Sequence, residues 1–219
     1  MRFRQAIVAA MTDEMSADES VIFFGEDVAA AEGPFKTSEG LLDTFGPIRV
    51  RDTPISEMAF TGAAVGAAMM GMRPVIEIMF MEFLGVALDA LVTEGAKMHY
   101  LSHGEYSVPM VVRASCGSGL GFGSQHSQTL ENWVAATPGL KVVQPSDAQS
   151  AYSLLRASIQ DNNPVMFLEP RILYAERGEV DTSLKMEIGK ARLLQEGSDV
   201  TIVSLGNMVN VARDAMKES

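Results

Sequence analysis

The stretch DTPISEMAFTGAAVGAAMMGMRPVIEIMF, residues 52–80, contains the pattern that decides the fold. Its first part is rich in alanine, glycine and methionine and has the length of a helix. Its last part, residues 74–80, is an almost continuous apolar run, which is typical of a strand covered on both faces. A helix that leads into such a strand indicates an α/β fold with a parallel sheet.

The same alternation extends in both directions along the chain. Apolar residues at four-residue spacing, from Phe3 to Met15, predict a first helix. Further strands are predicted at residues 21–24, 49–51, 110–113, 141–144 and 164–168, and helices at residues 57–72, 85–102, 126–135 and 146–160. We therefore predict an α/β domain with a mostly parallel sheet flanked by helices. In such sheets, ligands bind at the carboxyl ends of the strands.

A polar stretch at residues 171–186 interrupts this alternation and is interpreted as a linker. A strand at residues 200–205 and a helix from Asn207 are predicted after it, and these two elements alone cannot close a core. We expect a first domain over residues 1–186 and the start of a C-terminal α/β domain over residues 187–219. This second unit either packs on the first domain or belongs to a longer protein.

The composition narrows the class of protein. The 219 residues are 47% hydrophobic and 21% charged, as in soluble globular domains, and the net charge of −11 argues against nucleic acid or an anionic membrane as a partner. A single cysteine, Cys116, excludes an intrachain disulfide and favours a reducing compartment. Asp13 and Glu14 interrupt the N-terminal apolar stretch before a secretion signal is complete. We therefore expect a cytoplasmic protein.

Glu57 is the first candidate functional residue, because it lies between a predicted strand and a helix of very small residues. An acid in the first turn of a helix is favoured by the helix dipole and requires no function. Alternatively, Ile55, Met58 and Phe60 leave this carboxyl group poorly solvated, so that it can share a proton with a ring nitrogen of a ligand.

The DTPISE run, the small-residue helix and the following GMRPVIEIMFMEF together resemble the pyrimidine-binding domain of the beta subunit of the E1 component of 2-oxo acid dehydrogenase complexes. This family includes the pyruvate, branched-chain 2-oxo acid and acetoin dehydrogenases and has a transketolase-like fold. The resemblance implies that thiamine diphosphate is the cofactor. It also implies that Glu57 bonds the aminopyrimidine ring and activates the cofactor.

The resemblance also implies roles for residues after other strands. Glu26 lies in the loop near the cofactor, Ile55 and Ser56 flank Glu57, and Met79 and Phe83 line the pyrimidine ring or stack on it; ordinary core positions are the alternative for these last two. The segment RASCGSGLGFGSQHSQ, residues 113–128, fails the strict dinucleotide-binding spacing. In the family this segment brings a histidine to the active site. His126 would therefore handle protons or position substrate during acyl transfer to a lipoyl group. The alternative is that His126 has no catalytic role.

The segment SIQDNNPVMF, residues 158–167, indicates a helix end and a turn before a strand. The resemblance implies a structural potassium ion here, bound mainly by backbone carbonyls. Its ligands would come from five residues: Met110, Ser158, Ile159, Asp161 and Asn163.

The chain contains no Gly-Asp-Gly run, with which thiamine enzymes hold the diphosphate through magnesium. The resemblance therefore implies that an alpha subunit supplies this half of the site in an alpha-2 beta-2 heterotetramer, docked on a lipoyl-bearing E2 acyltransferase core. The chain would be active only with that subunit, in the oxidative decarboxylation of a 2-oxo acid. An acetoin dehydrogenase, a transketolase-like enzyme and a non-catalytic scaffold are the alternatives.

Overall fold

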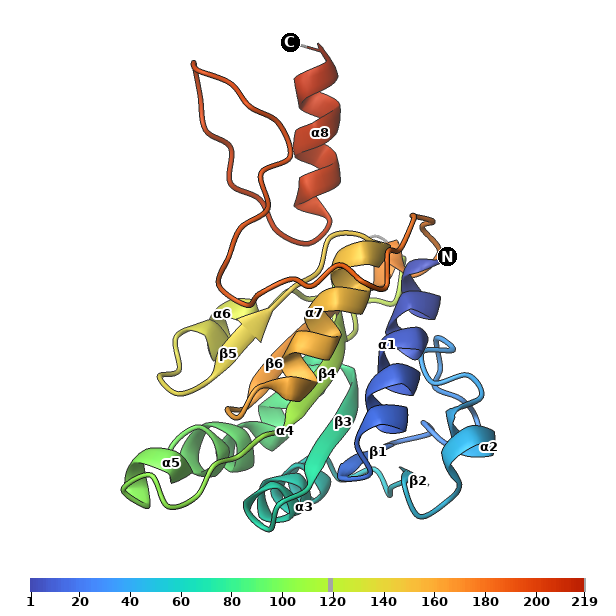
Figure 1. Ribbon diagram of the computed structural model, residues 1–219, viewed down its shortest axis with the longest axis vertical. Coiled ribbons are helices and arrows are strands. Elements are labelled where there is room, and N and C mark those ends of the chain that lie inside the picture. Colours follow the sequence, from blue (N-terminus) through green and yellow to red (C-terminus); the bar gives the residue numbers. More distant parts are fainter. Residues whose placement is uncertain (118–119, 219) are drawn as a thin grey trace.

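A parallel sheet of six strands forms the centre of the computed structural model, which describes residues 1–117 and 120–218 (Figure 1). The order across the sheet is β2-β1-β3-β4-β6-β5, and all the pairs are parallel. The strands are β1 (Val21–Gly25), β2 (Val50–Asp52), β3 (Arg73–Phe80), β4 (Val111–Cys116), β5 (Lys141–Val143) and β6 (Val165–Pro170). The predicted fold class is confirmed.

Helices connect the strands and cover both faces of the sheet (Figure 1). They are α1 (Phe3–Ala17), α2 (Leu41–Phe45), α3 (Glu57–Met69), the 3₁₀ turns η1 (Met81–Phe83) and η3 (Arg171–Leu173), α4 (Leu84–Leu88), the π-helix η2 (Asp89–Gly95), α5 (Met98–Leu101), α6 (Glu131–Ala135), α7 (Ala148–Gln160) and α8 (Met208–Glu218). The prediction of one continuous helix at residues 85–102 is wrong, since three separate helices, α4, η2 and α5, occupy this stretch.

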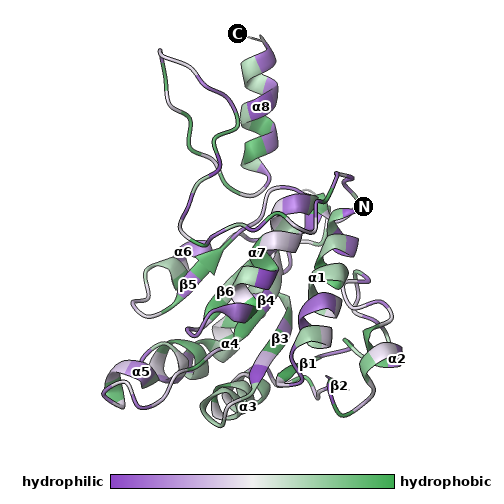
Figure 2. Ribbon diagram, viewed as in Figure 1, coloured by the Kyte–Doolittle hydropathy of each residue, from purple (hydrophilic) through white to green (hydrophobic). Residues whose placement is uncertain are grey.

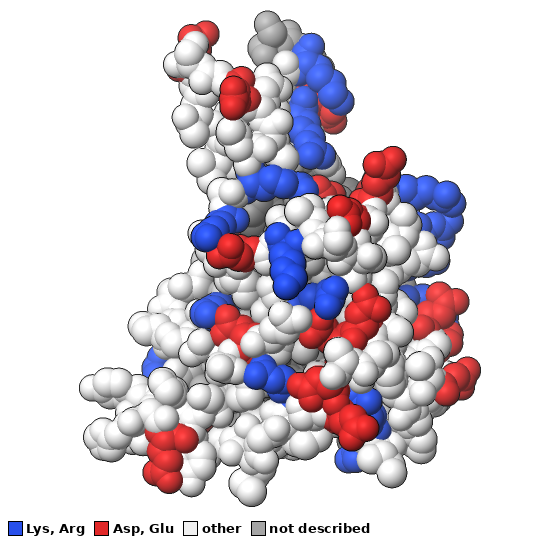
Figure 3. Space-filling view, viewed as in Figure 1, with Lys and Arg blue, Asp and Glu red and all other residues white. Residues whose placement is uncertain are grey.

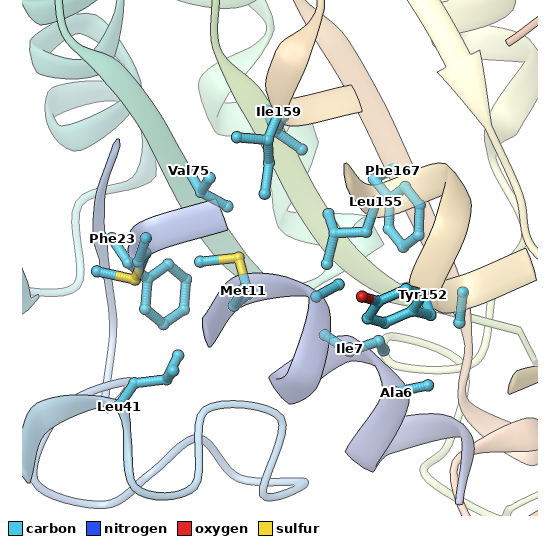
Figure 4. Close-up of a cluster of buried hydrophobic side chains, with 14 of the residues drawn as sticks. Ala6, Ile7, Met11, Phe23, Leu41, Val75, Tyr152, Leu155, Ile159 and Phe167 are labelled. Atoms are coloured by element: carbon cyan, nitrogen blue, oxygen red, sulfur yellow. The ribbon is translucent and has the colours of Figure 1, made fainter. Parts of the chain in front are cut away.

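The core has two apolar layers, one on each side of the sheet. Helices α1 and α7 cover one face, where Ile7, Met11, Tyr152 and Leu155 meet the strand residue Phe167 (Figure 4). Helices α3 and α4 and η2 cover the other face. Because both faces of the central strands are covered, β3, β4 and β6 are buried along most or all of their length rather than at alternate positions.

One group of charged and polar side chains is buried within the α1/α7 layer, and we call it the Arg113 network. Arg113 Nε donates to Glu169 Oε1 at 2.6 Å, and its Nη1 lies 3.2 Å from Glu77 Oε2. Tyr174 donates to Glu169 at 2.8 Å, and Thr37 donates to Glu77 at 3.2 Å. The network pairs one buried cation with two buried carboxylates. Buried charges require such partners because their removal from water costs free energy.

The C-terminal part of the chain extends away from the sheet as a loop and helix α8 (Figure 1). The strand predicted at residues 200–205 is wrong: these residues form no ladder, since no described strand lies beside them to supply hydrogen-bond partners. Val200, Ile202, Val203 and Leu205 are exposed, and Figure 2 shows hydrophobic stretches along this loop. The helix predicted from Asn207 is confirmed as α8. The domain boundary after residue 186 stays a prediction.

In the described ranges, no helix combines the length and the apolar character that crossing a bilayer requires. Acidic and basic side chains are interspersed on the face of the molecule seen in Figure 3.

Candidate active site

The carboxyl ends of β1 and β3 form the point at which the connections change direction. The chain leaves β1 for β2 on one side and returns to β3 on the other. Ligands of parallel α/β sheets bind at such points. Gly25 ends β1 here, and a Cβ at this position would lie 2.6 Å from the carbonyl oxygen of Glu77 in β3. Only glycine therefore allows this close approach of the two strands.

The loop after β1 is tied to the end of β2 by the side chain of Asp52. Its carboxylate accepts hydrogen bonds from the backbone N–H groups of Ala29, at 2.7 Å, and Ala30, at 3.2 Å. Glu26 lies in this loop. Burial raises the pKa of Glu26, and the charges of Asp27 and Glu57 raise it further. Glu26 and Glu57 are thus close enough for their charges to interact, and their assignment to a cofactor site stays a prediction.

Glu57 is the first residue of α3 and is only 7% exposed. No donor among the described residues hydrogen-bonds to its carboxylate. The surroundings predicted for it are partly wrong: Ile55 is 77% and Met58 54% exposed, and only Phe60 is buried. Positions 57 and 60 share one face of the helix, whereas position 58 points elsewhere. A buried carboxylate without a partner remains available to a ligand.

A cavity adjoins the N-terminus of α3. Its volume is about 420 Å³, and it is lined by Thr53, Pro54, Ser56, Ala59 and Phe60. Ser56 is the N-cap residue of α3, but its side chain makes no capping hydrogen bond. The predicted cofactor residue Ser56 thus lines a space beside Glu57, whereas Ile55 extends into solvent.

An aromatic group follows the end of β3. The ring of His126 lies edge-on to Phe80, at 4.5 Å between centroids, and to Phe83, at 5.4 Å. The pairing of β3 with β4 shifts its register between Ile78 and Phe80, so Met79 lies at a bulge, a feature that redirects side chains. Met79 and Phe83 are half-buried. Phe83 and His126 are therefore brought together, and their roles stay predictions.

His126 lies on a loop, and the helix predicted at residues 126–135 begins only at Glu131. Gly121 and Gly123 have φ angles of 75° and 78°, which no helix accommodates. The base of the loop is closed by hydrogen bonds from Gly117 N–H to the carbonyl of Gln128, at 2.9 Å, and from Gln128 N–H to the carboxylate of Glu82. Residues 118 and 119 of the glycine-rich segment lie outside the described residues.

Arg171 is a site residue that the sequence analysis assigned to a linker. It directly follows β6 and is 2% exposed. Its Nη2 donates to the carbonyl of Gly117, at 2.7 Å, and to the carbonyl of His126. Its guanidinium lies over the rings of Phe80 and Phe122, at 4.9 and 5.3 Å. Its position after a buried strand was the signal that could have revealed it.

The structure thus holds two groups at the carboxyl edge of the sheet. One consists of Glu26 and Glu57 with the adjoining cavity, and the other of Phe80, Phe83 and His126. No hydrogen bond or ring contact joins the two groups in the described part of the chain. Such an arrangement suits a ligand that contacts carboxylates with one part and aromatic rings with another.

The turn predicted to bind potassium follows α7. Its residues lie beside Met110, whose carbonyl accepts a hydrogen bond from Val165 N–H at 2.9 Å. Two cationic side chains already bind this turn. Arg73 donates to the carbonyls of Ile159, at 2.9 Å, and Asp161, at 3.1 Å, and Lys141 pairs with the Asp161 carboxylate at 2.5 Å. Each carbonyl keeps a second lone pair for a further ligand.

Comparisons with known proteins agree with this geometry. The family model described as "Transketolase, pyrimidine binding domain" matches residues 1–177. The mitochondrial pyruvate dehydrogenase E1 component subunit beta-2 of Oryza sativa subsp. japonica is 47% identical over 98% of this chain and 58% of its own length. The pyruvate dehydrogenase E1 component subunit beta of Rhizobium meliloti (strain 1021) is 44% identical over 100% of this chain and 48% of its own length. The chain thus spans about half of these relatives.

The solved structure of a split gene transketolase, an inactive beta4 tetramer, has the same fold, with a TM-score of 0.80 and 22% sequence identity. The alignment covers 100% of this chain and 67% of the transketolase chain. Since the family model covers most of the sequence, the chain belongs to the transketolase pyrimidine-binding domain family, and the predicted resemblance to E1 beta subunits is confirmed.

Proposed function

We propose that this chain provides the pyrimidine half of a thiamine diphosphate site in the E1 component of a 2-oxo acid dehydrogenase. The observation that carries the proposal is the carboxylate of Glu57, which is buried, accepts no hydrogen bond from the described residues and follows Ser56, a residue that lines a cavity at the switch point of the sheet. The apolar walls of this cavity at Pro54, Ala59 and Phe60 suit a flat heteroaromatic ring, and Glu57 directly follows the lining residue Ser56 in the chain.

Each residue of the site has a role in this proposal. Glu57 exchanges a proton with a ring nitrogen, and Glu26, whose pKa is raised by burial, sets the charge beside it. Met79 and Phe83 hold the faces of the ring, and Ser56 lines its edge. When bound, thiamine diphosphate supplies the electron sink for cleavage of the bond beside the 2-oxo group.

His126 acts in the second half of the reaction in this proposal. Its ring is held edge-on to Phe80 and Phe83, on the loop after β4, and Glu57 follows β2, so both come after the carboxyl ends of parallel strands. From there the imidazole handles protons or positions the lipoyl group during acyl transfer. Imidazole is suited to this task because it changes charge near neutral pH.

The remaining parts of the site come from partners. The sequence lacks a Gly-Asp-Gly run, so an E1 alpha subunit would hold the diphosphate and magnesium in an alpha-2 beta-2 heterotetramer that docks on a lipoyl-bearing E2 core. We also propose a potassium ion on the carbonyls around Met110 and residues 158–163, and a cytoplasmic location. The two names of the relatives favour pyruvate over a branched-chain 2-oxo acid or acetoin as the substrate.

The test is the exchange Glu57→Gln in the complete E1 enzyme with its alpha subunit. The amide keeps the shape but cannot exchange the proton, so we expect decarboxylation of pyruvate to fall by about a hundredfold or more, with the heterotetramer intact. Glu94→Gln, which changes an exposed acid, is the control. Wild-type turnover in the Glu57 variant would refute the proposal. Assays on branched 2-oxo acids and acetoin in the same experiment identify the substrate.

A further inference from the structure

Arg171 binds the glycine-rich loop at two points that lie far apart along it. A single atom, Nη2, donates to the carbonyl of Gly117, where the loop leaves β4, and to the carbonyl of His126 near its other end. No other side chain in the described part of the chain donates to the backbone of His126. The guanidinium of Arg171 thus binds the backbone from which the ring of His126 extends.

The side chain of Arg171 is itself held in one position. It is 2% exposed and lies over the rings of Phe80 and Phe122, and Phe80 also contacts the ring of His126. Cation–π contacts in a desolvated setting are stronger than on a surface. Burial lowers the pKa of Arg171, and the nearby carboxylate of Glu82 acts in the opposite direction. The same carboxylate accepts a hydrogen bond from the N–H of Gln128. Two opposite charges thus hold the same loop.

Nε and Nη1 of Arg171 are buried and have no hydrogen-bond partner among the residues that the structure describes. A buried donor without a partner costs free energy, and an apolar residue in this position would avoid that cost. The arginine therefore has a use other than filling space. The contact that an apolar residue could not make is the pair of hydrogen bonds to Gly117 and His126.

We propose that Arg171 is a positioning residue, which fixes the imidazole of His126 by binding both ends of the loop that carries it. This inference rests on the function proposed for His126. It predicts that loss of Arg171 affects the step that needs His126 and leaves the step that needs Glu57 largely intact. A purely structural arginine would affect both steps to the same extent.

The experiment uses the complete E1 enzyme with three variants of the beta subunit. Arg171→Met keeps the apolar stem and removes the donors, Arg171→Lys keeps an ammonium that can donate to two carbonyls, and Arg177→Met is the control for an exposed arginine. Decarboxylation of pyruvate is measured with an artificial electron acceptor, and acyl transfer is measured with an isolated lipoyl domain. For Arg171→Met we expect a loss of about ten- to a hundredfold in acyl transfer, and less than about threefold in decarboxylation.

A second measurement reports the loop without any activity. Chymotrypsin cleaves after residues such as Leu120 and Phe122, which are 48% and 43% exposed. We expect faster cleavage here in Arg171→Met, and cleavage near the wild-type rate in Arg171→Lys and Arg177→Met. Acyl transfer should recover in part in the lysine variant. If Arg171→Met does not fold, the lysine variant still tests the inference, since its acyl transfer should fall by a larger factor than its decarboxylation.

The inference is overturned by loop cleavage at the wild-type rate in Arg171→Met, or by equal losses in the two half-reactions. Cleavage distinguishes this failure from that of the proposed function. If Glu57→Gln retains full turnover, the role of the site is wrong, but faster cleavage in Arg171→Met would still show that Arg171 positions the loop.

Discussion

At the scale of single residues, the Arg113 network places charged side chains in the core, where removal from water costs free energy. Desolvation raises the pKa of Glu77, and the positive charge of Arg113 works in the opposite direction. Burial likewise raises the pKa of Tyr174, which donates to Glu169. The two acids can stay in the interior only because the guanidinium lies between them.

Replacement of Arg113 by methionine should therefore destabilise the protein strongly. Two carboxylates would remain buried without a cation, and the expected loss is about 3–5 kcal/mol in the free energy of unfolding. Urea denaturation of the 219-residue chain measures this loss. Arg51→Met, which changes an exposed arginine, should stay within about 0.5 kcal/mol of the wild type. A change of the same small size in Arg113→Met would show that the network contributes little.

Single residues were also the hardest features to predict. The position of Glu57 followed from the strand–helix junction, but the exposure of Ile55 and Met58 did not, since it depends on which side of α3 faces the sheet. Arg171 lies in a polar run in the sequence, and its role depends on carbonyls 54 and 45 residues earlier in the chain. No local pattern encodes such a contact.

At the scale of elements, the N-terminus of helix α7 is stabilised by a local cap and also contacts the long loop after β6. Its N-cap, Asp147, accepts a hydrogen bond from Ser150 N–H at 2.8 Å and forms an ion pair with Arg192. The cap stabilises the start of the helix, and the ion pair fastens the C-terminal part of the chain to it. The predicted start of this helix lies within two residues of the observed one, because the capping signal is local.

The two contributions of Asp147 can be separated by two variants. Asp147→Ala removes both the cap and the ion pair and should cost about 1 kcal/mol or slightly more in the free energy of unfolding. Asp147→Asn keeps the capping oxygen and loses only a partly exposed ion pair, so its cost should be below about 0.5 kcal/mol. Chemical denaturation of the two variants tests this order. Equal losses in both variants would mean that the ion pair, and not the cap, stabilises this region.

The errors in predicting elements have a common cause. The stretch of residues 85–102 has helical composition, but η2 widens into a π-helix where Gly95 packs against α3, and an added Cβ would lie 3.3 Å from Val65. The strand predicted at residues 200–205 has strand composition but no neighbour. In the first case a tertiary contact overrides local preference, and in the second the missing neighbour leaves it without effect. The six strands of the sheet each have a neighbour, and all except the short β2 have largely apolar sequences that predicted them.

At the scale of the whole molecule, the proposed function makes the site one half of a composite. Glu26, Glu57, Phe83 and His126 each follow the carboxyl end of a parallel strand, and the sequence lacks the diphosphate-binding run. In the proposed function, affinity for thiamine diphosphate is therefore a property of the complex. This follows because interactions with the diphosphate and its magnesium ion contribute a large share of the binding free energy.

Isothermal titration calorimetry checks this dependence. With thiamine diphosphate and magnesium, the chain alone should show no saturable heat at cofactor concentrations up to about 1 mM. A dissociation constant of about 1 mM corresponds to a binding free energy of only about 4 kcal/mol. The complete beta subunit mixed with its alpha subunit should show saturable binding at least a hundredfold tighter. Equal affinity without the alpha subunit would contradict the composite site. The same titration without magnesium separates the contribution of the metal.

The packing of α1 on α7 also determines when the protein can finish folding during its synthesis. Arg156 of α7 binds Glu14 of α1, which precedes it by 142 residues, and Phe3 N–H donates to the carbonyl of Glu176. A ribosome needs on the order of ten seconds to add that many residues. During this time the part of the apolar side of α1 that packs on α7 has no partner in the nascent chain. Helix α1 is thus fully covered only late in synthesis, and the domain closes only after β6 has emerged.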